Sequence, residues 1–140
     1  MAFYPETSLV RAPHRDTPEM KLLIVDDNAD MRRLITGLVG DLAETICECS
    51  DGATALAAYI EHRPDWVLMD IKMPGMDGMA ATEQITGAFP EAQIVMVTDF
   101  GDAKLRAQAN AAGACAFVIK EDLFALRGIL AKKLQAKTHS

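Results

Sequence analysis

Short, mainly apolar runs recur along the chain from residue 20 onward, separated by segments of helical length. The runs are Leu22–Val25, Thr45–Cys49, Trp66–Met69, Ile94–Val97 and Ala116–Ile119. Because continuous apolar runs without polar alternation are typical of strands covered on both faces, they predict a parallel sheet. Their spacing of about 20 to 28 residues leaves room for one helix between successive strands.

The segments between these runs carry apolar residues at helical spacing. In the first segment, Leu34, Leu38 and Leu42 repeat every four residues, with Ile35 and Val39 beside them. The fourth segment, Lys104 to Ala112, is rich in alanine and only weakly amphipathic. The second, third and fifth segments are marked by Ala53, Leu56, Ala57 and Ile60, by Met79, Thr82, Ile85 and Phe89, and by Leu123, Leu126, Leu130 and Leu134.

Residues at the ends of these segments agree with helix boundaries. Asp51 and Asp77 are expected to cap the starts of the second and third helices, and Gly113 to end the fourth in a left-handed conformation. Five strand–helix units predict an α/β domain, a doubly wound parallel sheet with helices on both faces.

Polar residues follow every predicted strand, and those after the second strand, Ser50 and Asp51, are interpreted as the start of a helix. The first strand ends in Asp26 and Asp27, the third in Asp70, the fourth in Thr98 and the fifth in Lys120. In open α/β sheets, ligands bind outside the carboxyl ends of the strands, where the strand order reverses. With the order 2-1-3-4-5 that point lies between strands one and three, so these side chains are expected to converge.

The chemistry of this set favours phosphoryl transfer. Three crowded carboxylates repel one another, and a hard divalent cation relieves that repulsion. Oxygen ligands with room for water suit Mg²⁺. A lysine and a threonine beside the metal can neutralise and hydrogen-bond phosphoryl oxygens. The carboxylate of Asp70, flanked by both, is a candidate acceptor that forms an acyl phosphate.

Composition narrows the function classes. The chain has 140 residues, enough for one domain, and a formal net charge of −6, which argues against nucleic acid or an anionic membrane as the main partner. Cys47, Cys49 and Cys115 show no CxxC spacing, and the first two are interpreted as small buried residues of a strand. No apolar run approaches the ~20 residues of a membrane span, and the start lacks a signal-peptide pattern. These features favour a reduced, cytoplasmic location.

Residues 1–19 differ from the rest of the chain, since they hold three of the six prolines and show no sustained periodicity. We expect them to form a flexible leader. The alternative is a docking arm that uses Phe3, Tyr4, Leu9 and Val10. Residues 20–137 are expected to form the single folded domain, without a following output domain.

Four stretches, LLIVDDNADMRRL (22–34), WVLMDIKMPGMDG (66–78), IVMVTD (94–99) and AFVIKED (116–122), make the chain resemble a known family. This family is the response-regulator receiver domains of two-component signalling, the CheY-like superfamily. The resemblance covers residues 20 to about 135. It implies a flavodoxin-like fold, with the five-stranded order 2-1-3-4-5.

The resemblance also implies a role for each site residue. Asp70 would be the phosphoacceptor and would also supply a carboxylate ligand to the metal. Asp27 would bind Mg²⁺ directly, Asp26 mainly through metal-bound water, and Lys72 through its backbone carbonyl. Thr98 and Lys120 would bind the phosphoryl oxygens.

Further positions match the family's loop and switch residues. Pro74 and Gly75 would shape the loop after the acceptor. Phe117 would be the aromatic switch residue that responds to Thr98. On its own, this ring is equally well interpreted as core packing.

Two residues depart from the common family pattern, and a third lies at a position that affects phosphoryl lifetime. Glu121 follows Lys120, where proline in a cis bond is common, so this turn is expected to lack a cis peptide. Asp99 follows Thr98, where a small residue is usual, and its charge can repel phosphodonors or alter hydrolysis. Phe100 occupies a position that tunes phosphoryl lifetime in the family.

The expected function is that of a stand-alone response regulator. It would accept a phosphoryl group from a sensor histidine kinase or a histidine phosphotransfer protein, as part of a phosphorelay. It would signal to a protein partner through its helix 4–strand 5–helix 5 face, and phosphorylation can also promote a dimer. Its only catalysis would be its own Mg²⁺-dependent phosphorylation and dephosphorylation.

Two alternatives belong to other classes. The first is a protein-binding adaptor that keeps the receiver fold but works without phosphorylation. The second is a haloacid-dehalogenase-like phosphatase, which we set aside because residues 26–30 read DDNAD and lack the DxDx[TV] motif.

Overall fold

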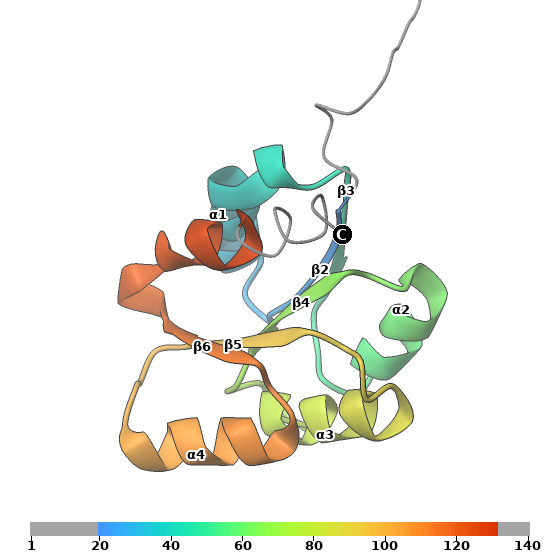
Figure 1. Cartoon of the computed structure of the whole chain (residues 1–140), viewed down its shortest axis with the longest axis vertical. Coiled ribbons are helices and arrows are strands. Elements are labelled where there is room, and N and C mark those ends of the chain that lie inside the picture. The colour runs from blue at the N-terminus through green and yellow to red at the C-terminus, as the bar shows by residue number, and fades with distance from the viewer. Residues whose placement is uncertain (1–19, 132–140) are drawn as a thin grey trace, which may run out of the picture.

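The computed structural model describes residues 20–131, and its centre is a parallel sheet (Figure 1). The strands lie in the order β3-β2-β4-β5-β6. When the five strands are numbered from one to five in chain order, this order is 2-1-3-4-5. The predicted fold class is therefore confirmed. The strands are β2 (Lys21–Val25), β3 (Thr45–Cys49), β4 (Trp66–Asp70), β5 (Ile94–Thr98) and β6 (Ala116–Ile119).

Helices cover both faces of this sheet (Figure 1). The helices are α1 (Ala29–Val39), α2 (Ala55–His62), α3 (Gly78–Ala88) and α4 (Ala103–Ala112), with the short 3₁₀ turns η2 (Gly40–Leu42) and η3 (Lys120–Asp122). Residues 125–131 are also helical. The core under α1 and residues 125–131 lies on one face, and the core under α2, α3 and α4 lies on the other.

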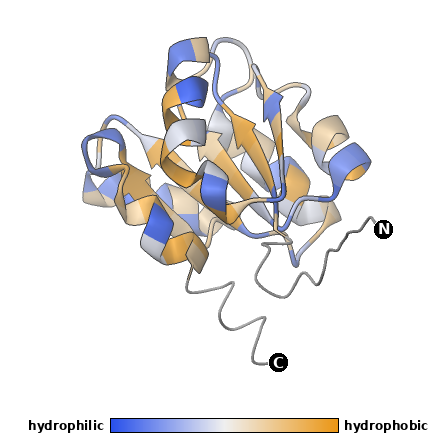
Figure 2. Cartoon of the chain, turned by 90° about the horizontal axis from the view of Figure 1, so that it is seen from above, coloured by the Kyte–Doolittle hydropathy of each residue, from blue (hydrophilic) through white to orange (hydrophobic). Residues whose placement is uncertain are grey.

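The central strands β2, β4 and β5 are apolar apart from Lys21, Asp70 and Thr98 at their ends, because every other residue belongs to one of these two cores (Figure 2). On β2, Leu22 and Ile24 pack toward α1, whereas Leu23 and Val25 pack toward the opposite core. Successive side chains of a strand point to opposite faces, so a strand covered on both sides needs apolar residues at every position.

Local side-chain caps fix where most helices begin. Asp77 caps α3 by accepting a hydrogen bond from Ala80 N, and Gly113 ends α4 at φ 107°, as the sequence predicted. The prediction for Asp51 is wrong. The α2 helix begins at Ala55 after Thr54, and Asp51 instead accepts hydrogen bonds from the Thr54 N–H and hydroxyl, holding a turn before the helix.

The buried faces of α1 and α2 differ from those expected. Leu34 is 51% exposed and Ile60 is 52% exposed, while Ile35 and Val39 on α1 are buried. On α2 the buried residues are Ala55 and Tyr59. Both segments carry more than one apolar stripe, and their placement on the sheet decides which stripe is covered.

Some sequence expectations fall outside the described residues. These are the leader, residues 1–19, and the end of the fifth helical segment, including Leu134. Within the described part, Leu123, Leu126 and Leu130 are buried as predicted, and Cys49 lies in the core. Among residues 20–131, no helix is long and apolar enough to cross a membrane.

Candidate metal and phosphoryl site

The strand ends bring three carboxylates together at one edge of the sheet. Asp26 follows β2 directly, and Asp70 is the last residue of the neighbouring strand β4. Val25 pairs with Met69, so Asp26 and Asp70 lie at the same level. One carboxylate oxygen from each of Asp26, Asp27 and Asp70 lies within 4.8 Å of the others.

Lys120 lies between the two buried carboxylates. Its Nζ is 3.4 Å from Asp26 Oδ2 and 3.2 Å from Asp70 Oδ1. Asp26 Oδ2 is buried and accepts no hydrogen bond, so its contact with Lys120 is an ion pair without hydrogen-bond geometry. A buried carboxylate oxygen with spare acceptor capacity, beside two further carboxylates, fits a hard cation such as Mg²⁺.

The electrostatics of this cluster oppose ionisation of Asp70. Burial, followed by repulsion from Asp26, raises the pKa of Asp70 to about 6, although Lys120 acts in the opposite direction. For Lys120, burial lowers the pKa, but the charges of Asp70 and Asp26 outweigh it and the net shift is upward. In the absence of metal, the single ammonium therefore does not fully compensate the three carboxylates.

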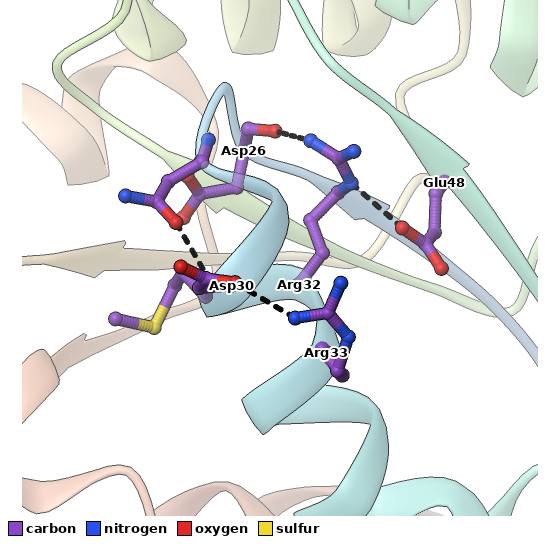
Figure 3. Close-up of polar contacts among 7 residues, drawn as sticks. Asp26, Asp30, Arg32, Arg33 and Glu48 are labelled. Carbon is purple, nitrogen blue, oxygen red and sulfur yellow. Dashed lines mark hydrogen bonds and ion pairs between the residues drawn. The ribbon is translucent and has the colours of Figure 1, made fainter.

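Asp26 is held by hydrogen bonds at its backbone and its side chain. Its N–H donates to Cys49 O at 3.0 Å, and its Oδ1 accepts from Asn28 N at 2.9 Å. The guanidinium of Arg32 donates to the Asp26 backbone oxygen at 2.6 Å and to Glu48 Oε1 at 2.6 Å (Figure 3). Asp27 is exposed, so a hydrated ion can reach its carboxylate from solvent.

Thr98 and Phe117 lie on the neighbouring strands. Thr98 is 1% exposed at the end of β5 and pairs with Ile119, the residue before Lys120. The Thr98 hydroxyl accepts a hydrogen bond from Phe100 N at 3.4 Å. Phe117 is half-buried, and the Arg106 guanidinium lies 4.6 Å from the centre of its ring.

The loop after Asp70 folds back closely on the acceptor strand. Gly78 N donates to Ile71 O at 2.8 Å, and a Cβ on Gly78 would lie 2.0 Å from Asp70 O, so glycine is required there. Gly75 has φ 77°, a left-handed conformation suited to glycine, beside the exposed Pro74. The roles of Pro74 and Gly75 in this loop stay predictions.

Two loops meet beside the site through Lys72 and Phe100. The Lys72 Nζ lies 4.7 Å from the centre of the exposed Phe100 ring. Asp99 is also exposed, and its charge contributes to raising the pKa of Lys120. The described residues contain no cis peptide bond, so the turn at Glu121 is trans as expected.

Arg32 and Glu48 support the site but were not predicted from the sequence. The two residues are far apart in the chain and meet only because β3 lies beside β2, with Glu48 paired to Ile24. The available signal was the charged Glu48 inside the strand TICEC. Glu48 is exposed on the edge strand β3, where a carboxylate needs no partner, so this signal alone did not predict the contact with Arg32.

Comparisons with known proteins agree with this geometry. Residues 22–131 match the sequence model of the response regulator receiver domain. The chain is 42% identical to the chemotaxis protein CheY of Bacillus subtilis (strain 168) over 101 residues, which cover 71% of this chain and 84% of that protein. It is 34% identical to the regulatory protein AtoC of Escherichia coli (strain K12) over 84% of this chain, but over only 26% of AtoC.

Solved structures show the same fold. A two-component response regulator of the LuxR family from Aurantimonas sp. SI85-9A1 superposes with a TM-score of 0.78 at 28% identity, covering 84% of this chain and 86% of that one. CheY in the CheX-CheY-BeF3-Mg complex of Borrelia burgdorferi gives a TM-score of 0.70 at 29% identity, covering 76% and 83%.

Proposed function

Because this chain belongs to the response regulator receiver domain family, we propose that it is a phosphorylation-dependent switch whose acceptor is Asp70. A sensor histidine kinase or a histidine phosphotransfer protein supplies the phosphoryl group, and the product signals through contacts with another protein. The observation that carries this proposal is the convergence of Asp26, Asp27 and Asp70 on Lys120 at one edge of the sheet.

Each site residue has a separate role in phosphoryl transfer. A carboxylate oxygen of Asp70 attacks phosphorus, and the bond from phosphorus to the donor nitrogen breaks. The electron pair stays on the donor imidazole, which takes up a proton from solvent, and Asp70 becomes an acyl phosphate. Lys120 pairs with one phosphoryl oxygen, and the Thr98 hydroxyl donates to another.

The metal site uses the same strand ends. Mg²⁺ would be held by Asp27 directly, by a carboxylate oxygen of Asp70, by the backbone carbonyl of Lys72, and by Asp26 mainly through water. When bound, Mg²⁺ would supply positive charge that offsets the charge on the phosphoryl oxygens. No residue of this site is suited to turning over a separate metabolite, so the chemistry serves the protein's own phosphorylation and dephosphorylation.

Phosphorylation changes the surface through Thr98 and Phe117. The new group adds roughly −1.5 to −2 charges and three acceptor oxygens at Asp70. Thr98 moves toward these oxygens, which leaves space for the ring of Phe117 to turn inward. The surface of α4, β6 and residues 125–131 then changes shape and presents a different face to its protein partner.

Incubation of the wild-type chain with acetyl phosphate, with and without Mg²⁺, tests this function. Intact-mass spectrometry is expected to show one added phosphoryl group that needs Mg²⁺ and is lost in excess EDTA. If no adduct forms with acetyl phosphate or with a phosphorylated phosphotransfer protein, and beryllofluoride does not bind, the proposed function is wrong. The phosphorylation-independent adaptor would then be favoured.

Removing the ring of Phe100 is expected to shorten the lifetime of the acyl phosphate. In our proposal the contact between Lys72 and Phe100 restricts the approach of water to Asp70. A cation–π contact at an exposed position is worth about 0.5–1 kcal/mol, so Phe100→Ala should shorten the half-life about two- to fivefold. The decay of the phosphorylated mass after removal of the donor measures this.

Phe100→Tyr is the control for this prediction, because it keeps an aromatic ring for Lys72. Its half-life is expected to stay close to that of the wild type. An unchanged half-life in Phe100→Ala would show that the ring does not restrict the attacking water.

A further inference from the structure

The Arg32 side chain donates two hydrogen bonds to residues outside its own helix, α1. It lies in the first turn of α1, where a cation is unfavourable because the helix dipole is positive at that end. Its side chain is only 17% exposed, and its two short hydrogen bonds go to other elements (Figure 3). The position of Arg32 therefore reflects these partners and not helix stability.

The bond to Asp26 acts on the peptide unit that joins the two acidic residues. The carbonyl of Asp26 belongs to the rigid plane that also contains the N–H of Asp27. Arg32 Nη1 lies 2.6 Å from this carbonyl oxygen, so it fixes the rotation of the plane. That rotation sets the direction in which the Asp27 side chain leaves the backbone.

Both ends of this arrangement are anchored on β3. The Asp26 N–H donates directly to Cys49 O, and the Asp26 carbonyl is linked through Arg32 to Glu48. Asp27 itself receives no hydrogen bond in the described residues that would orient it otherwise. Its direction depends on the peptide plane that Arg32 holds.

We propose that Arg32, braced by Glu48, is a positioning residue that sets the geometry of Asp27 and thereby the affinity of the site for Mg²⁺. The proposal rests on the function proposed above. Residues outside the direct ligands commonly change metal affinity by about 10- to 100-fold when they are replaced, because they orient the ligands. Arg32 would affect the Mg²⁺ affinity by orienting Asp27, and would not itself be a metal ligand.

If Arg32 acted only through its positive charge, its removal would change the Mg²⁺ affinity in the opposite direction. Removing a cation near an acidic site should strengthen Mg²⁺ binding. Arg33 offers a matched control, because it is the next residue on α1, pairs only with Asp30 at 2.7 Å and has a side chain that is 74% exposed. Arg33→Gln removes the same charge but leaves the Asp26 carbonyl and Glu48 untouched.

Mg²⁺ titrations of the full chain, followed by backbone amide NMR at constant ionic strength, test the proposal. We expect Arg32→Gln to weaken Mg²⁺ binding about tenfold. Arg33→Gln should bind like the wild type or slightly tighter. Arg32→Lys keeps the charge, but its single ammonium cannot span both oxygen partners, so it should also bind Mg²⁺ more weakly than the wild type.

The spectra also show whether each variant is folded before metal is added. If Arg32→Gln does not fold, Arg32→Lys decides, because its charge is that of the wild type. If the folded Arg32 variants bind Mg²⁺ as tightly as Arg33→Gln does, Arg32 is not a positioning residue. That result would leave the proposed function unaffected. A wild-type chain that binds no Mg²⁺ would overturn the proposed function and this inference together.

Discussion

Asp70→Asn is expected to abolish Mg²⁺-dependent incorporation of a phosphoryl group from acetyl phosphate. Asp70 is 4% exposed, and asparagine has the same shape, so the fold should be preserved. The amide oxygen carries no full negative charge and is a poor nucleophile for phosphorus. Intact-mass spectrometry should therefore show the adduct in the wild type and none in the variant.

Asp30→Asn is the matched control, because Asp30 is an exposed carboxylate on α1 whose contact is with Arg33. This variant should take up one phosphoryl group as the wild type does. An adduct of equal yield in Asp70→Asn would mean that another residue accepts the group, and peptide mapping would identify it. That result would overturn the assignment of Asp70.

In the metal-free protein, the charge of Asp70 is expected to reduce stability above pH 6. The folded-state pKa is about 6, compared with the ordinary value of 3.8, so the folded state binds more protons than the unfolded state between these values. The free energy of unfolding should therefore fall as pH rises from about 4 to about 6. Two pKa units correspond to at most about 3 kcal/mol, and water reaching the site past the exposed Asp27 should reduce this to about 1–2 kcal/mol.

Asp70→Asn isolates this contribution from the other acidic groups that titrate in the same range. Urea unfolding in EDTA should give similar stabilities for the two proteins near pH 4, and a more stable variant near pH 7.5. Lys120 keeps its contact with Asp26 in the variant, at 3.4 Å in the wild-type structure. A variant less stable than the wild type at pH 7.5 would show that the pair with Lys120 outweighs burial and repulsion.

Saturating Mg²⁺ should reverse the order of stability. The ion compensates the three carboxylates and stabilises the wild type by binding only the folded state. Asp70→Asn lacks one of these carboxylates and should gain less. The difference between the two proteins at pH 7.5 therefore reports metal binding at Asp70 independently of phosphorylation.

The sequence determined the sheet, because its central strands are apolar at nearly every position. Short apolar runs bounded by polar residues, such as Leu22–Val25 and Ile94–Val97, favour strands covered on both faces, and both runs lie inside observed strands. The caps at Asp77 and Gly113 were predictable for a similar reason, since each makes its hydrogen bonds within a few residues. Local chemistry of this kind can be interpreted without knowing the fold.

The sequence also indicated which residues carry the chemistry, because strand ends in a parallel sheet share one edge. Asp26 and Asp70 are distant in the chain, yet the strand order places them side by side. The prediction needed only that order and the positions of the polar residues. The roles assigned to these residues remain predictions for the experiments above.

Tertiary structure alone decided which helix faces are buried and what holds the site in place. Leu34 and Ile60 lie outward although they fit an apolar stripe, because the contact surface of the sheet selects one stripe of several. The link from Glu48 through Arg32 to the Asp26 carbonyl joins a strand, a helix and a loop. Each of its bonds depends on distances between separate elements, and those distances are set by packing, which the order of residues along the chain does not express.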